Sequence, residues 1–253
     1  MSGHSKWSTI KHQKGQTDVK RGQLFTKLSR EITVSVKQGG GNSDANVRLR
    51  LAIQKARDGN MPISNIERAV KKALGQSDGQ ADLEEIIYEG YGPGGIAILV
   101  QVASDNKNRA ISEVRTLFSR NDAALGASGS VSWQFDTMGV ISIEAESESK
   151  AEEFALSAID LGAKDFLQEG SFLEIQVALD SFDELQKAIE SMGVTITSAE
   201  ICQVPKSSVS VNEHDARKAL GLLDRLEELD DVQKVYTNAD FPETILQQYK
   251  TAA

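Results

Sequence analysis

The chain has 253 residues, of which 40% are hydrophobic and 26% are charged, and its formal net charge is −9. These values are ordinary for a soluble globular protein, and the length allows one large domain or two to three small ones. A single cysteine, Cys202, excludes an internal disulfide framework. The most apolar run, residues 96–103, is far shorter than the roughly 20 residues of a membrane helix. Without an apolar leader segment, we expect a cytoplasmic protein.

Charge is divided unevenly along the chain. Residues 1–75 hold 15 basic and 5 acidic side chains, whereas residues 76–253 hold 13 basic and 32 acidic ones. The global acidity therefore hides a basic segment with a net charge of +10. Such asymmetry indicates an anionic partner for the basic segment. In the alternative, which does not exclude the first, the basic segment docks against the acidic part of its own chain.

The basic segment begins with a polar arm and continues as a helix. Residues 1–16 show no apolar period and predict an extended arm. From Asp18 onward, apolar residues recur at helical spacing, with basic residues on the opposite face. The glycines at 39–41 end this predicted helix, because glycine readily adopts positive φ.

Two shorter helices are predicted next. The second begins near Ser43 or Asp44, which are both good N-caps. The third begins near Ser64, where Ser64 and Glu67 form a capping-box pattern. Residues 1–80 are therefore expected to form an all-α domain with basic outer faces.

The acidic part has mixed periodicity. Its predicted elements are strands at 86–91 and 96–104, a helix at 107–120, strands at 131–135 and 139–145, a helix at 148–161, strands at 163–170 and 172–179, a helix at 181–191, strands at 195–204 and 207–211, a helix at 213–229 and a strand at 232–238. The final residues, 241–253, are expected to be a frayed tail.

This order predicts an α+β fold of three domains. Residues 139–204 follow the β-α-β-β-α-β order of a ferredoxin-like domain. The flanking strands lack partners of their own and can complete one sheet. We therefore expect the all-α domain to be followed by two ferredoxin-like α+β domains, a middle one at 81–136 plus 205–240 and an inserted one at 137–204.

Sequence patterns do not indicate an enzyme. GYGPGG at 90–95 matches G-x-G-x-x-G, but a strand follows it, so a β-hairpin turn is favoured over a nucleotide site. The histidines His4, His12 and His214 lack metal-ligand spacing. No nucleophile elbow or phosphate-binding loop occurs. We expect no catalytic residues, no metal and no cofactor.

Two further features have ordinary structural explanations. The acids Glu227, Glu228, Asp230 and Asp231 are predicted to be a solvated acidic face and not a magnesium site. Cys202 is predicted to be a small core residue and not a nucleophile.

The strongest chemical signal is the spacing of basic residues on the arm and on one face of the first helix. Such residues can each contact a phosphate, and counterion release then drives binding. Aromatic residues are few in the basic segment, which favours contact with the nucleic-acid backbone over base stacking. The predicted nucleic-acid-binding residues are Lys6, Trp7, Lys11, His12, Lys14, Lys20, Arg21, Lys27 and Arg30.

A second polar surface is predicted at DNKNR, residues 105–109. Asp105 or Asn106 can cap the following helix, which is a purely structural role. Asn106, Asn108 and Arg109 also concentrate donors where a helix N-terminus favours an anion. Capping alone and capping with a ligand surface both remain open.

Several short motifs occur in order along the chain. They are GHSKW at 3–7, IKH at 10–12, KRG at 20–22, FTK at 25–27, NMP at 60–62, YEGYGPGG at 88–95, DNKNR at 105–109, GSVSW at 129–133 and DDVQKVYTN at 230–238. In this combination the sequence resembles the YebC/PmpR family, which includes the mitochondrial translational activator of cytochrome c oxidase. The resemblance covers residues 3 to about 240 and departs at NDAALG, residues 121–126, where the family usually has a glycine-rich turn.

The resemblance implies three domains and a non-enzymatic regulator. Some members of the family are described as DNA-binding transcriptional regulators. Others act as ribosome-associated factors that help translation through stretches such as consecutive prolines. We therefore expect a cytoplasmic regulator of transcription that binds DNA, with binding of ribosomal or transfer RNA, and association with the ribosome, as the alternative. A ligand-sensing module is a further alternative that rests on fold analogy alone.

Overall fold

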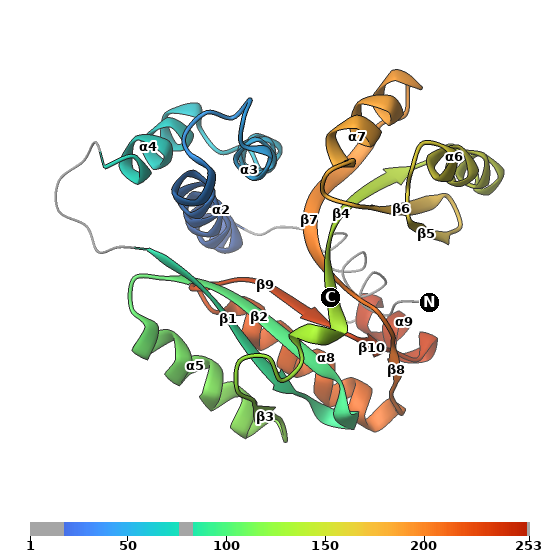
Figure 1. Cartoon of the computed structure of the whole chain (residues 1–253). Helices are drawn as coiled ribbons and strands as arrows, with labels where there is room; N and C mark the ends of the chain where they lie inside the picture. The colour runs from blue at the N-terminus through green and yellow to red at the C-terminus, as the bar shows by residue number, and fades with distance from the viewer. Residues whose placement is uncertain (1–17, 76–82, 252–253) are drawn as a thin grey trace.

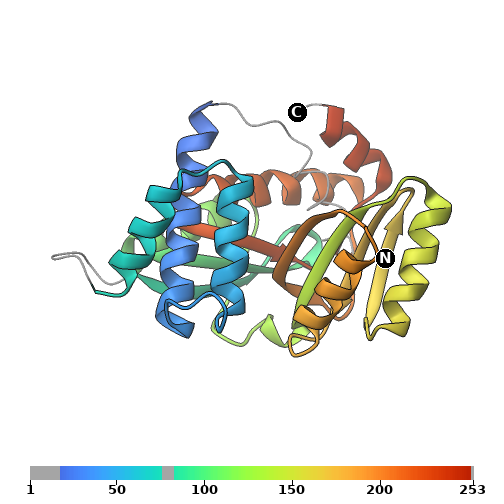
Figure 2. The same cartoon turned by 90° about the horizontal axis from the view of Figure 1, so that it is seen from above.

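The computed structural model of the chain describes residues 18–75 and 83–251 (Figure 1). Its elements gather in three groups, which we call the helical module (α2 to α4), the middle module (β1 to β3, α5, α8 and β9) and the inserted module (β4 to β7, α6 and α7). The helical and inserted modules lie side by side on the middle module, as the two views agree (Figures 1 and 2). The domain limits expected at residues 80, 136 and 204 stay predictions.

The helical module contains α2 (Asp18–Gly39), α3 (Val47–Asp58) and α4 (Ile63–Ala73). Their apolar faces meet in one small core, in which Ile32, Leu49 and Ile66 are buried. This burial, and not helix propensity, provides most of the stability of such short helices.

The predicted starts of α3 and α4 were wrong by a few residues. The N-cap of α3 is Asn46, which accepts a hydrogen bond from the Leu49 amide at 3.0 Å. Asn46 is buried, and its amide also donates to the carbonyl oxygens of Ser35 and Gly40, so it joins α2 to α3. Pro62 occupies the N-cap of α4 without a side-chain hydrogen bond. Its fixed φ suits the entry into a helix, and the helix begins before Ser64, so the predicted capping box does not form.

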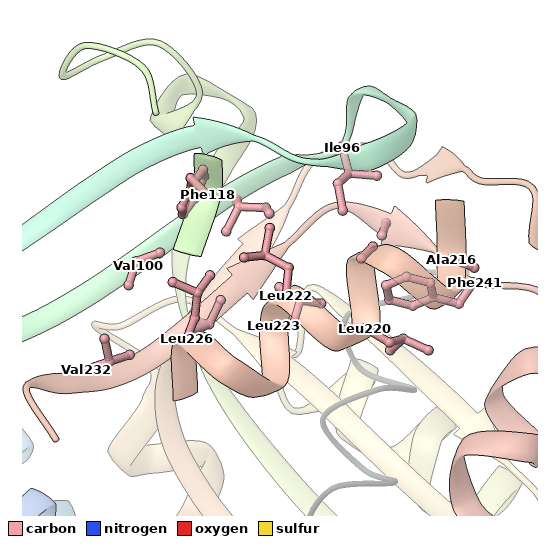
Figure 3. Close-up of a cluster of buried hydrophobic side chains, with 14 of the residues drawn as sticks. Ile96, Val100, Phe118, Ala216, Leu220, Leu222, Leu223, Leu226, Val232 and Phe241 are labelled. Carbon is pink, nitrogen blue, oxygen red and sulfur yellow. The ribbon is translucent and has the colours of Figure 1, made fainter. Parts of the chain in front are cut away.

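The middle module is a four-stranded antiparallel sheet in the order β3-β1-β2-β9. The strands are β1 (Glu84–Tyr91), β2 (Ala97–Ser104), β3 (Ala124–Leu125) and β9 (Val232–Thr237). Helices α5 (Lys107–Arg120) and α8 (Glu213–Glu228) supply apolar residues to one core with this sheet. Figure 3 shows Leu222, Leu223 and Leu226 of α8 pointing toward Val100 and Phe118. The other face of the sheet is left for the neighbouring modules.

The chain enters this sheet in a permuted order. Strands β2 and β3 both run antiparallel to β1, which lies between them but precedes both in the sequence. The two-layer plan is that of a ferredoxin-like domain, whereas the order of its strands along the chain differs. The segment GYGPGG forms the turn between β1 and β2, with a short helix η1 (Pro93–Gly95) and positive φ at Gly94 and Gly95. The prediction of a hairpin turn is confirmed.

The inserted module has the expected ferredoxin-like topology. Its strands are β4 (Phe135–Glu144), β5 (Asp165–Glu169), β6 (Phe172–Val177) and β7 (Ile196–Pro205), and its helices are α6 (Glu148–Asp160) and α7 (Phe182–Ser191). The sheet order is β5-β6-β4-β7. Phe182 packs so closely on β4 that a Cβ at Gly139 would lie 1.9 Å from its ring. A residue larger than glycine therefore does not fit at this position.

Two predictions of local structure were wrong. Residues 131–135 do not form a separate strand, because Ser132–Gln134 is a short helix, η2, that leads into β4. The C-terminal residues are not a frayed tail, since Glu243–Thr251 forms α9, whose Ile245 and Leu246 are buried in the core of the middle module. The two-residue strands β8 (Val209–Ser210) and β10 (Ala239–Asp240) pair beside it.

Candidate nucleic-acid interface

The predicted nucleic-acid-binding residues fall into three sets. Lys6, Trp7, Lys11, His12 and Lys14 lie outside the described residues. Lys20 and Arg21 lie in α2, close to its first residue. Lys27 and Arg30 lie further along α2, and the structure assigns them contacts within the protein.

Lys27 faces the middle module and not the solvent. Its ammonium group donates a hydrogen bond to the carbonyl oxygen of Glu227, near the end of α8. Burial lowers the pKa of Lys27 to about 8, against an opposing effect of Asp230. A partly buried ammonium that already has a protein acceptor is poorly placed to contact a phosphate, so the expectation for Lys27 is corrected.

Arg30 also contacts the middle module. Its guanidinium lies 2.7 Å from a carboxylate oxygen of Asp231 and donates to the carbonyl oxygen of Asp230. The other carboxylate oxygen of Asp231 accepts from Ser104 at 2.7 Å and from Arg109 at 2.8 Å. Asp231 is buried, so the expected solvated acidic face is wrong at this residue. Its carboxylate joins the helical module to the middle module.

A second inter-module contact centres on Arg48 of α3. Its guanidinium lies 2.9 Å from Glu31 on α2 and 2.5 Å from Glu85 on β1. Burial acts to raise the pKa of Glu85, but the charge and hydrogen bonds of Arg48, together with hydrogen bonds from Gln101 and Gln38, lower it overall. Gln38 and Gln101 donate further hydrogen bonds to the same carboxylate.

A third contact brings together one residue from each module. Glu200 on β7 of the inserted module lies 2.6 Å from Lys55 on α3 and 2.7 Å from Lys234 on β9. Burial acts to raise the pKa of Glu200, but the two ammonium groups outweigh it and hold the pKa well below its ordinary value. The inserted module is held again where Arg50 contacts Asp183 at 2.5 Å. The basic segment therefore docks on the acidic part of its own chain.

These contacts surround a cavity of about 400 Å³ at the junction of the three modules. Leu24, Leu51 and Ile87 contribute to its apolar walls, while Lys27 and charged residues of the second and third contacts also line it. The side-chain nitrogen of Gln233 is buried beside it and has no hydrogen-bond partner among the described residues. The volume lies within the range of small-molecule sites.

The helical module also carries a set of exposed cations that were not among the predicted binding residues. Arg68, Lys71 and Lys72 lie on α4 and Arg57 lies near the end of α3, and all four are exposed. Spacings of three and four residues place the α4 cations on one helix face. Within the described part of the chain, none of the four forms an ion pair or side-chain hydrogen bond. Their spacing of three and four residues along one predicted helix is the signal that could have identified the α4 cations in the sequence.

The second polar surface is largely structural. Asn106 caps α5 by accepting from the Arg109 amide at 3.0 Å, which confirms the capping role. The Arg109 side chain pairs with Asp105 and with Asp231, each at 2.8 Å. Asn108 alone of the three residues is exposed without a described side-chain contact. The arrangement therefore leaves little donor capacity for a ligand.

Other kinds of site find no support within the described ranges. No group of three or more His, Cys, Asp or Glu side chains among those residues could hold a metal ion. None of the described helices combines the length and apolarity needed to cross a membrane. Burial raises the pKa of the Cys202 thiol to about 11, which disfavours the nucleophilic thiolate.

Comparisons with known proteins match this architecture over nearly the whole chain. One family model, described as the TACO1/YebC protein N-terminal domain, matches residues 5–76, and another, described as the TACO1/YebC second and third domain, matches residues 83–239. A probable transcriptional regulatory protein of Dehalococcoides mccartyi is 52% identical, with both chains covered completely. A protein of the same description from Moorella thermoacetica is 48% identical and covers 98% of this chain and 99% of its own. The crystal structure of a conserved hypothetical protein from Aquifex aeolicus, 45% identical, has a TM-score of 0.85 and covers 94% of this chain and 98% of its own.

Proposed function

The chain belongs to the TACO1/YebC family, and we propose that it is a regulatory protein of transcription that binds the phosphate backbone of DNA through its basic N-terminal segment. The names of its relatives support the regulatory part of this proposal. The DNA-binding part rests on the charge of residues 1–75.

One observation carries the DNA-binding part. Five basic side chains of the segment contact other parts of the protein: Lys27, Arg30, Arg48, Arg50 and Lys55. The segment also has exposed cations that have no described partner. Its net charge of +10 exceeds what these contacts neutralise. Cations that remain unpaired in the docked molecule can displace counterions from a polyanion without breaking the inter-module contacts.

The proposed contacts therefore come from two sources. Lys6, Lys11, Lys14, Lys20 and Arg21 supply the cations of the N-terminal end, with Trp7 and His12 between them in the sequence. The exposed face of α4 supplies Arg68, Lys71 and Lys72. The strongly acidic remainder of the chain repels nucleic acid and so orients the complex.

Crosslinking in cells tests which nucleic acid is bound. Wild-type protein and the variant Lys11→Ala/Lys14→Ala/Lys20→Ala are crosslinked, and the recovered nucleic acid is sequenced alongside sedimentation through a sucrose gradient. Crosslinks to chromosomal DNA that disappear in the variant support the proposal. Crosslinks to ribosomal RNA with ribosome co-sedimentation would replace it with the translational alternative. Recovery of neither nucleic acid would refute both.

Ligand sensing is a second candidate, favoured by the cavity at the module junction and by the Gln233 amide beside it. It predicts that a metabolite extract raises the thermal stability of a chain that lacks residues 1–16. It also predicts no salt-sensitive binding of nucleic acid. The two candidates therefore differ in both measurements.

A further inference from the structure

Two exposed aromatic side chains share one hydrogen-bond acceptor on the middle module. Trp133 is 67% exposed and Tyr91 is 40% exposed. The indole nitrogen of Trp133 donates to the carbonyl oxygen of Ser130 at 3.1 Å, and the Tyr91 hydroxyl donates to the same oxygen at 2.9 Å. The polar ends of both rings are thus held beside one atom, while much of their surface stays open to solvent.

The loop that carries Trp133 is fixed by a buried carboxylate. We call residues 126–134 the platform loop. The Glu89 carboxylate on β1 accepts from the amides of Gly129 at 2.7 Å and of Val131 and Ser132, each at 2.8 Å. Burial acts to raise the pKa of Glu89, but these three N–H groups outweigh it and lower the pKa. Val131 is fully buried and anchors the middle of the loop.

A cation lies beside the backbone of the exposed Trp133. The ammonium of Lys206 donates to the carbonyl oxygen of Trp133 at 3.0 Å and lies 3.3 Å from a carboxylate oxygen of Asp136. Its side chain is half-exposed, and an ammonium group has a third donor to offer. The platform loop itself contains no acidic residue. An anionic group can therefore approach the loop without meeting a loop carboxylate, and the one carboxylate described at the ammonium is that of Asp136.

A rigid, exposed aromatic surface next to a cation is chemically suited to a nucleotide. Bases stack on aromatic side chains in proteins that bind single strands, while basic groups contact the backbone. A ring that is already fixed loses little conformational entropy on binding. A base inside a duplex has both faces stacked and cannot offer one to Trp133, so the duplex is excluded at this surface.

We propose that the platform loop binds an unpaired nucleotide, with the base stacked on Trp133 beside Tyr91 and a phosphate at the ammonium of Lys206. The inference rests on the proposed function and deepens it, because it adds a single-stranded segment to the backbone contacts of the helical module. Melted DNA and single-stranded RNA both supply this chemistry.

Binding is measured by fluorescence anisotropy with three probes: a fully paired DNA duplex, one of its strands, and the RNA of the same sequence. Trp133→Ala is expected to weaken binding of the single strands roughly tenfold and to leave duplex binding within about twofold. Trp133→Phe, which keeps an aromatic ring, is expected to restore most of the affinity. The single-stranded probe whose binding Trp133→Ala weakens more shows whether DNA or RNA supplies the unpaired nucleotide.

Two controls separate this inference from the proposed function. Leu156→Ala removes another exposed apolar side chain, on α6, and should change no affinity. In a Trp7→Phe background Trp133 is the only tryptophan, and its emission should be quenched by a single strand and not by the duplex. If the wild type binds the probes, and Trp133→Ala weakens binding of all three equally or weakens none of them, the platform site alone would be overturned. Absence of wild-type binding to every probe would overturn the proposed function as well.

Discussion

Arg30 on α2 and Asp231, the residue before β9, form an ion pair of 2.7 Å between segments that are far apart in the sequence. Both side chains are largely buried, and Asp231 also accepts from Arg109 and Ser104. Arg30 thus has an internal role in holding the helical module. In the proposed function, nucleic-acid binding is therefore assigned to cations that do not take part in docking.

The Arg30–Asp231 contact should show a measurable coupling energy. A double-mutant cycle of Arg30→Ala and Asp231→Ala, followed by urea unfolding, is expected to give about 1–3 kcal/mol, because the pair shares one partly buried network. Arg57→Ala with Asp231→Ala is the matched control, since Arg57 has no described partner, and its coupling should be near zero. A coupling near zero for both pairs would mean that the ion pair does not hold the modules together.

Acid should weaken the docking of the helical module. Asp231 and Glu200 have lowered pKa values in the folded protein because cations and hydrogen bonds outweigh burial. The unfolded chain then binds more protons as the pH falls, so their stabilisation is present above the ordinary carboxyl pKa and is lost below about pH 4.

Urea unfolding across this pH range measures the effect. The variant Asp231→Asn/Glu200→Gln starts less stable and should lose less free energy of unfolding between about pH 5 and about pH 3. A variant that loses as much as the wild type would show that these two carboxylates do not link docking to pH.

Lys27 should give a pH dependence of the same sign, but in the alkaline range. Burial lowers its pKa from 10.5 to about 8 in the folded state. Between these values the unfolded chain holds the proton and the folded chain releases it, so this residue makes the stability rise with pH. The rise should be absent in Lys27→Met and kept in Lys71→Met, which alters an exposed lysine. Identical slopes for the two variants would argue against a buried Lys27.

Glu89 should stabilise the platform loop. Glu89→Gln replaces one acceptor oxygen by an amide that faces backbone N–H groups, and is expected to lower the free energy of unfolding by about 2 kcal/mol. Glu152→Gln, on the exposed side of α6, should change it by less than about 0.5 kcal/mol. Equal effects in urea unfolding would show that the three amide contacts of Glu89 contribute nothing specific.

Helix α9 should be part of the folded core. Leu246 is 1% exposed, and Leu246→Ala is expected to destabilise the protein by about 2–5 kcal/mol. Its exposed neighbour Gln247 serves as control, with a change for Gln247→Ala of less than about 0.5 kcal/mol. If thermal or urea unfolding finds both variants as stable as the wild type, the tail does not pack as described.

The fold followed from local patterns wherever an element was long and periodic. Helices α2, α5 and α8 lie close to their predicted bounds, because apolar spacing and end signals agreed in each. Helix α9 was missed, since its nine residues carry only a short apolar pattern. Its buried Ile245 and Leu246 pack against a core formed by distant segments, which no local pattern reveals.

The site was less predictable than the fold. Lys27 and Arg30 have the same spacing in the sequence whether they face a phosphate or a carboxylate. Their partners lie near residue 230, and only the folded arrangement brings the two regions together. Asp231 sits in an acidic run of the kind usually exposed, and its burial depends on Arg30 and Arg109. By contrast, the charge imbalance between the two parts of the chain was sufficient to predict that docking could occur.

The salt dependence of DNA binding tests the central claim most directly. Anisotropy with a DNA duplex compares Arg68→Ala/Lys71→Ala/Lys72→Ala with Lys150→Ala/Lys164→Ala/Lys187→Ala, which removes three exposed cations from the inserted module. The first variant should bind more weakly, and its slope of log affinity against log salt should fall by about 0.9 for each phosphate that the protein no longer neutralises. The second should match the wild type in both respects. Equal weakening of the two variants, or wild-type binding that does not depend on salt, would contradict binding through the helical module.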